Sequence, residues 1–157
     1  MIESFPRLQQ PLGSNSCLPT AIRAVLIWYG VEDSELLDSI SEICGESELG
    51  CDFDTALAGL RVEFEIVDLS QSEEEIRALV SGTGDPQPVI VNLRNQSEIG
   101  PPYHAVVLIA IEYEGEDPKS NEIVTFLDPI TGQLDKANSF FWVAWSRADF
   151  RAFTVQP

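Results

Sequence analysis

The sequence predicts a single α+β domain in which helices and strands form segregated layers. Apolar residues recur at helical spacing in the first part of the chain, whereas strand-like runs dominate the second part. The 157 residues, 44% hydrophobic and 22% charged, have the size and composition of one ordinary globular domain. No linker-like stretch or internal repeat divides them, so we expect one domain over residues 1–157.

The first helix is predicted to begin at about residue 17. Pro6, Pro11 and Gly13 exclude a helix from the first sixteen residues. After them, apolar side chains recur every three or four residues up to Gly30: Leu18, Ala21, Ile22, Val25, Leu26 and Tyr29. Pro19 fits the first turn of this helix, where its missing N–H is not needed.

Two further helices and one extended segment follow. A second helix is expected after Asp33 with Gly45 as its stop, and a third, shorter one near residues 52–54. The stripe of the third helix contains Ala56, Leu57 and Leu60. Val62, Phe64 and Ile66 alternate with polar residues, which predicts a strand.

The second half of the chain alternates less regularly and is rich in strands. Residues 72–75 (Ser-Glu-Glu-Glu) form a capping box that opens a helix through Val80. Strands are expected over residues 88–93, 104–113 and 123–127, and the last two flank a turn-rich connector at 115–121, which predicts an antiparallel hairpin. A short helix at 139–145 and a final strand at 150–155 complete the prediction.

The charge and cysteine content limit the function classes. Nine Lys and Arg against 26 Asp and Glu give a net charge of −17, which argues against nucleic-acid or membrane-surface binding and favours basic partners. Three cysteines are too few for a disulfide framework. No signal peptide or bilayer-length apolar run is visible, so we expect a soluble, cytoplasmic protein. The oligomeric state stays open.

Cys17 is the best candidate for a nucleophile. It stands at the predicted start of the first helix, where unpaired N–H groups and the helix dipole favour an anion. We therefore expect its thiol to ionise more readily than a free cysteine. Cys44 and Cys51 lie near a helix end or in an acidic connector and lack this position.

His104 is the one histidine in the chain, so any imidazole chemistry must use it. It opens one strand of the predicted hairpin, and Asp128 closes the other, so both arrive at the open end. A bulge or a small change of register would bring them into contact, and the carboxylate would then orient the ring. Gln10 precedes Cys17 and offers an amide that, with the Cys17 backbone N–H, would stabilise an oxyanion.

Taken singly, each of these residues is more often structural, but their order along the chain is specific. A glutamine, a cysteine at a helix start, a histidine at a strand start and an aspartate on the next strand resemble the papain-like clan of cysteine peptidases. The sequence is most similar there to the bacteriocin-processing peptidases, which cut after a double-glycine leader, and their stand-alone relatives. Three segments carry the resemblance: residues 10–30, 103–112 and 124–132.

The resemblance implies a papain-like fold in which N-terminal helices pack on an antiparallel sheet. It also implies Cys17 as nucleophile, His104 as general base and acid, Asp128 as orienter and Gln10 as oxyanion donor. Two positions depart from the family pattern: Leu18 replaces the glycine after the nucleophile, and the glutamine stands one residue further upstream. Whether Gln9 or Gln10 faces the site, and whether double-glycine leaders are cut, stays open.

The expected function is peptide-bond hydrolysis through a thioester acyl-enzyme, with a peptide or protein substrate. Two alternatives remain: an acyl transferase or amidase on the same scaffold, and a binding module that has lost turnover and holds a basic partner. No cofactor or metal is expected. Cys44 and Cys51 have the wrong spacing for zinc, and Asp52 and Asp54 lack the rest of a calcium loop.

Overall fold

A computed structural model describes residues 2–47, 50–82, 84–94, 104–113 and 121–157 of the chain. A short 3₁₀ turn, Ile2–Ser4, precedes the regular elements. The α-helices are α1 (Cys17–Trp28), α2 (Ser34–Ile43), α3 (Phe53–Glu63), α4 (Glu73–Ser81) and α5 (Phe140–Arg147). The strands are β1 (Glu65–Asp68), β2 (Val89–Leu93), β3 (His104–Tyr113), β4 (Glu122–Asp128), β5 (Gln133–Ala137) and β6 (Ala152–Gln156).

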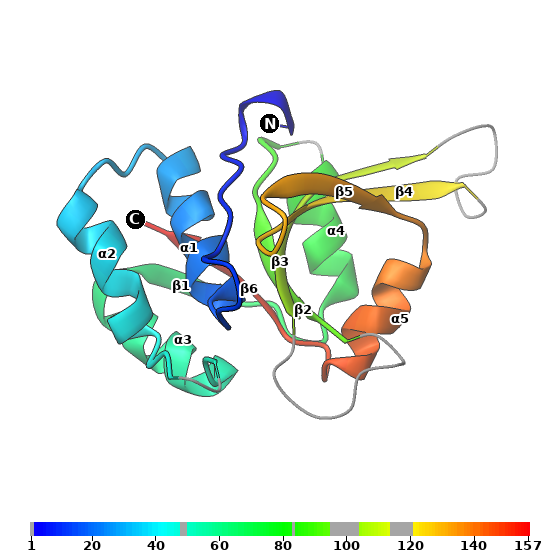
Figure 1. The fold of residues 1–157 in the computed structure, drawn as a ribbon. Helices are drawn as coiled ribbons and strands as arrows, with labels where there is room; N and C mark the ends of the chain where they lie inside the picture. Colours follow the sequence, from blue (N-terminus) through cyan, green and yellow to red (C-terminus); the bar gives the residue numbers. More distant parts are fainter. Residues whose placement is uncertain (1, 48–49, 83, 95–103, 114–120) are drawn as a thin grey trace.

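The strands form one six-stranded sheet in the order β1-β6-β2-β3-β4-β5, with every neighbouring pair antiparallel. Helices α1, α2 and α3 gather on one side of this sheet, and α4 and α5 cover the other (Figure 1). Two apolar clusters, one on each face, therefore hold the layers together. The predicted α+β class and the packing of the N-terminal helices on an antiparallel sheet are confirmed.

Helix α1 packs against the centre of the sheet with its apolar stripe. Ala21, Ile22, Val25 and Leu26 are fully buried, in the same cluster as side chains of β2, β3 and β6. Burial of each large aliphatic side chain contributes about 1.5–3 kcal/mol. This packing fixes the orientation of α1, and with it the position of Cys17 at its first turn.

The boundary between α3 and β1 differs from the prediction. The alternation of Val62, Phe64 and Ile66 suggested a strand from residue 62, but α3 continues to Glu63 and β1 begins at Glu65. Val62 is 81% exposed because it lies on the outer side of a helix whose Leu57 and Leu60 face the core. Three alternating residues are too few to distinguish the period of a strand from that of a helix. The packing of α3 through Leu57 and Leu60 decided for the helix.

Two other predictions about local structure were incomplete. Ser72 precedes α4 as expected, but its side chain makes no capping hydrogen bond; the helix dipole and the ion pair of Glu73 with Arg77 favour the acidic first turn instead. Strand β5 was not predicted, because Gln-Leu-Asp-Lys-Ala has little strand propensity; pairing with β4 holds it. The strands of the hairpin pair as predicted, while residues 114–120 of their connector lie outside the described residues.

The described helices are short. The longest, α1, has 12 residues, whereas a bilayer span needs about 20. Within the described parts of the chain, none is both long and apolar enough to cross a membrane.

We expect Gly59→Ala to lower the free energy of unfolding by about 2 kcal/mol, because α2 and α3 touch at this glycine. A Cβ on Gly59 would lie 2.1 Å from the Ile43 carbonyl oxygen, a contact that only a shift of α3 relieves. The loss should occur although alanine favours a free helix by about 1 kcal/mol. Urea unfolding measures it, with Gly84→Ala as the control because nothing lies within 4 Å of that position. An unchanged Gly59→Ala midpoint would show that the helices are not in contact.

Candidate active site

Cys17 is the first residue of α1, and its side chain meets the start of β3. The backbone N–H of Ala105 donates a hydrogen bond to the Cys17 Sγ over 3.4 Å. Ala105 directly follows His104, so this contact joins the helix start to the strand start across 88 residues of sequence. The structure thus brings the predicted nucleophile next to the element that carries the predicted base.

His104 and Asp128 form a hydrogen-bonded pair. The Nε2 of His104 lies 2.8 Å from Oδ1 of Asp128, and the backbone N–H of Ile130 donates to the same oxygen over 2.9 Å. In neutral histidine, a carboxylate at Nε2 selects the tautomer with the proton on that nitrogen. The lone pair is then left on Nδ1, where the ring can accept a proton.

A β-bulge decides that the two residues can meet. The register of β3 against β4 shifts by one residue between Leu108 and Ala110. Below the bulge Val107 pairs with Leu127, so His104 and Asp128 project from the same face of the hairpin. On the other side of the bulge Ala110 pairs with Thr125. If that register continued as far as His104, the side chains of His104 and Asp128 would point to opposite faces of the hairpin. The sequence suggested a bulge as one way to join them, and the structure contains it.

The structure separates the two glutamines before Cys17. Gln10 is 9% exposed, and its Nε2 donates to the Ser14 carbonyl over 2.7 Å, whereas its Oε1 is buried without a partner among the described residues. Gln9 is exposed, and its Nε2 donates to the carbonyl of Ile130. Gln10 is therefore the glutamine whose amide is held inside the loop that leads to Cys17.

This loop is attached to the turn that follows Asp128. The backbone N–H of Gln10 donates to the Pro129 carbonyl over 2.8 Å. Gly132 ends the turn with φ of +69°, and a Cβ there would lie 2.8 Å from the Cβ of Gln9. Glycine is therefore needed at this position for both the backbone conformation and the close approach. The segment that carries Gln10 and the turn that carries Asp128 are positioned as one unit.

The expectation that Cys17 ionises readily is wrong for this structure. Burial raises the pKa of the Cys17 thiol above its ordinary value, because the thiolate loses hydration. Hydrogen bonds from the backbone N–H groups of Ala105 and Leu18 lower the pKa but do not offset the burial. The helix start does supply donors to the sulfur, as expected. The sequence could not show how deeply the thiol is buried.

The other two cysteines lie together near the candidate nucleophile. The Cys44 and Cys51 thiols hydrogen-bond to each other, which lowers the pKa of Cys51 and raises that of Cys44. All three cysteines are free thiols. Among the described residues, no group of three or more His, Cys, Asp or Glu side chains is placed to hold a metal ion.

The two aspartates considered as calcium ligands have structural roles. Asp52 caps α3 by accepting hydrogen bonds from the N–H and Oγ1 of Thr55. Asp54 pairs with Arg151, whose guanidinium also lies over the ring of Phe53, 4.6 Å from its centroid.

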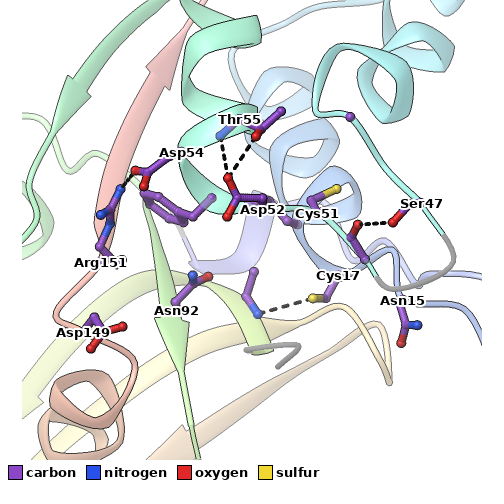
Figure 2. Close-up of a pocket in the computed structure, with 15 residues that line it drawn as sticks. Asn15, Cys17, Ser47, Cys51, Asp52, Asp54, Thr55, Asn92, Asp149 and Arg151 are labelled. Atoms are coloured by element: carbon purple, nitrogen blue, oxygen red, sulfur yellow. Dashed lines mark hydrogen bonds and ion pairs between the residues drawn. The ribbon is translucent and has the colours of Figure 1, made fainter. Parts of the chain in front are cut away.

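A pocket of about 430 Å³ opens beside Cys17 (Figure 2). Its wall combines residues of the α2–α3 connection and the start of α3 with residues of β2, β3 and the segment before β6. The lining residues that carry chemistry are Asn15, Cys17, Asp52, Asp54, Asn92, Asp149 and Arg151. Sequence reasoning missed Asn92, Asp149 and Arg151. A signal for Asn92 was present, since it is the polar residue within the apolar run Val-Ile-Val-Asn-Leu.

The layer order and the helix that carries Cys17 define a papain-like peptidase fold. In a comparison with solved structures, the chain is similar to the peptidase domain of Streptococcus ComA, described as a bifunctional ABC transporter involved in a quorum-sensing pathway. The TM-score is 0.69 at 15% sequence identity, and the match covers 98% of each chain. At 15% identity this likeness shows the fold alone. The papain-like fold that the sequence resemblance implied is therefore confirmed. No family model matches the sequence, and no significant match to a curated protein was found.

The raised pKa predicts slow alkylation of Cys17 at neutral pH. With iodoacetamide, Cys17 in the folded protein should react more slowly than an unstructured cysteine. Its alkylation rate should also keep rising with pH in the range where the alkylation rate of a free cysteine no longer changes. Peptide mapping by mass spectrometry resolves the three cysteines, and the urea-unfolded chain is the control. A plateau below pH 8 would instead show a thiolate already stabilised in the resting protein.

Gly132→Ala tests the close approach of Gln9 to the Asp128 turn. We expect it to lower the free energy of unfolding by about 2–3 kcal/mol, because strain at positive φ adds to the overlap with Gln9. Gly13→Ala is the matched control: Gly13 has φ of +74° but nothing within 4 Å, so strain alone acts there. Equal losses in the two variants would contradict the contact. Chemical denaturation measures both.

Proposed function

We propose that this protein is a cysteine peptidase that uses Cys17, His104 and Asp128 to cleave peptide bonds. The observation that carries the proposal is the hydrogen-bonded His104–Asp128 pair at the start of β3, where the next backbone N–H contacts the Cys17 sulfur. Likeness of the fold to a peptidase domain supports the same conclusion.

The raised pKa of Cys17 favours a general-base route over a preformed ion pair. The neutral thiol gives its proton to Nδ1 of His104 as the sulfur attacks the peptide carbonyl carbon. The resulting tetrahedral intermediate expels the amine, which takes the proton from His104 and leaves a thioester on Cys17. Water then attacks the thioester with His104 as base, which releases the acid and restores the thiol.

Asp128 and Gln10 have supporting roles in this proposal. Asp128 holds the tautomer with the proton on Nε2 and stabilises the imidazolium that forms during attack. Its second partner, the Ile130 N–H, fixes the carboxylate in place. The Gln10 amide, held by the Ser14 carbonyl, and the Cys17 backbone N–H would stabilise the oxyanion.

The substrate in this proposal is a peptide or protein, and the net charge of −17 favours a basic one. No cofactor takes part in any step. A thiol nucleophile and three free cysteines suit a reducing compartment, so we propose that the protein acts in the cytoplasm.

Substitutions at the triad should separate its roles. Cys17→Ala should abolish hydrolysis and the acyl-enzyme, because no thioester can form. His104→Ala should slow hydrolysis about 10³-fold by removing the base, and Asp128→Asn should slow it by a smaller factor. Cleavage of a mixed synthetic peptide library, followed by mass spectrometry, measures all three.

Cys44→Ala is the matched control for Cys17→Ala, because Cys44 is a buried core thiol outside the pocket lining. It should keep the wild-type rate. Hydrolysis that survives Cys17→Ala would overturn the proposal, as would a folded protein that cleaves nothing in the library. If added amines or thiols intercept the acyl-enzyme better than water, the protein is an acyl transferase.

A further inference from the structure

Two cysteines that the proposed mechanism does not use lie in contact beside the pocket. Cys44 and Cys51 flank the connection between α2 and α3, and their thiols hydrogen-bond to each other. Cys44 is fully buried in the apolar cluster that includes α1. Cys51 is half-buried and lines the pocket that also contains Cys17 (Figure 2). One thiol of the pair is therefore enclosed in the core, while the other can be reached through the pocket.

The backbone of this connection holds the two thiols together. Between them, Ser47 and Gly50 pair as an isolated antiparallel bridge, with N–H to carbonyl distances of 3.2 and 3.0 Å. The Ser47 hydroxyl also donates to the Gly50 carbonyl over 3.1 Å. The bridge brings the residues before and after it close to each other. Thiols that already touch satisfy the proximity that a disulfide requires.

The three cysteines differ in how readily they ionise. The hydrogen bond from the Cys44 thiol lowers the pKa of Cys51, against the opposing effects of burial and of the Glu46 carboxylate, and the Arg23 guanidinium lowers it further. Burial raises the pKa of Cys17, and the contact with Cys51 raises that of Cys44. Since the thiolate is the form that attacks an oxidant, Cys51 is the cysteine best placed to be oxidised first.

We propose that Cys44 and Cys51 are a modification site at which a peroxide forms a disulfide within the chain. The Cys51 thiolate attacks one oxygen of hydrogen peroxide, which breaks the O–O bond, leaves a sulfenic acid on Cys51 and releases hydroxide. The Cys44 thiol then attacks the Cys51 sulfur, and its proton leaves with the sulfenic hydroxyl as water. Two electrons pass from the two sulfurs to the peroxide.

This site is separate from the candidate nucleophile, although both lie at the same pocket. The disulfide would close a ring over residues 44–51 and fix Cys51 against the core, in the wall of the pocket. Cys17 would remain a thiol, because its raised pKa makes it the slower of the two pocket cysteines to react. The inference goes beyond the proposed function and does not depend on it.

The test treats the reduced protein with hydrogen peroxide and then blocks the remaining thiols with N-ethylmaleimide under denaturing conditions. Digestion without reductant separates the three cysteines, because cleavage after Arg23 divides Cys17 from the pair and cleavage after Glu46 lies between Cys44 and Cys51. Mass spectrometry identifies the linked fragments. We expect the Cys44–Cys51 disulfide to form about tenfold faster than any oxidised form of Cys17.

Cysteine variants resolve the order of the two steps. Cys44→Ala should stop the reaction at the Cys51 sulfenic acid, which dimedone traps. Cys51→Ser should leave Cys44 reduced, because Cys44 is enclosed in the core. Cys17→Ala is the matched control, and it should form the disulfide at the wild-type rate.

A charge variant tests the surroundings of the pair. Glu46→Gln removes a negative charge that disfavours the Cys51 thiolate, and its side chain can still accept the hydrogen bond from the Ser16 hydroxyl. It should speed disulfide formation about threefold. Glu74→Gln removes one charge from the exposed start of α4, on the other face of the sheet, and should leave the rate unchanged.

The outcomes distinguish this inference from the proposed function, since none of them depends on hydrolysis. Oxidation of Cys17 before the pair, or a disulfide between Cys17 and Cys51, would overturn the site. A sulfinic acid on Cys51 with Cys44 still reduced would also overturn it, because the two sulfurs would then be too far apart to join. A pair that oxidises in a protein without peptidase activity would support the site and leave only the peptidase proposal contradicted.

Discussion

The contact between the start of α1 and the start of β3 is the constraint on which the candidate site depends. The Ala105 N–H reaches the Cys17 sulfur only because the apolar stripe of α1 packs on the centre of the sheet. Close-packed side chains hold a helix in one position, so burial far from the sulfur sets the position of its first turn. Helix α1 thus both fills the core and positions the candidate nucleophile.

Burial at this junction also determines how the thiol can react. A sulfur on a helix N-terminus would be an easily ionised thiol if it were well hydrated, but desolvation outweighs the backbone donors here. The resting thiol is therefore neutral, and under the proposed function the His104–Asp128 pair would supply the base. We expect such a buried thiol to be alkylated slowly at neutral pH.

The likeness to the ComA peptidase domain concerns the fold. The pocket beside Cys17, by contrast, is lined by side chains particular to this sequence. Folds carry many specificities, because the residues that line a cleft change without altering the layers beneath it. In this protein Asn92, Asp149 and Arg151 line the wall on the side of the sheet.

The sequence by itself determined the α+β class, the helix that begins at Cys17 and the hairpin ended by His104 and Asp128, because these follow from local periodicity and from turn residues. It misjudged the end of α3 and missed β5, where packing and strand pairing outweigh propensity. Only the tertiary structure decided the register of β3 on β4, the burial of the Cys17 thiol and the pocket that opens beside it. These features depend on contacts between residues far apart in the chain. Neither a one-residue bulge nor the desolvation of a thiol produces a periodic pattern in the sequence.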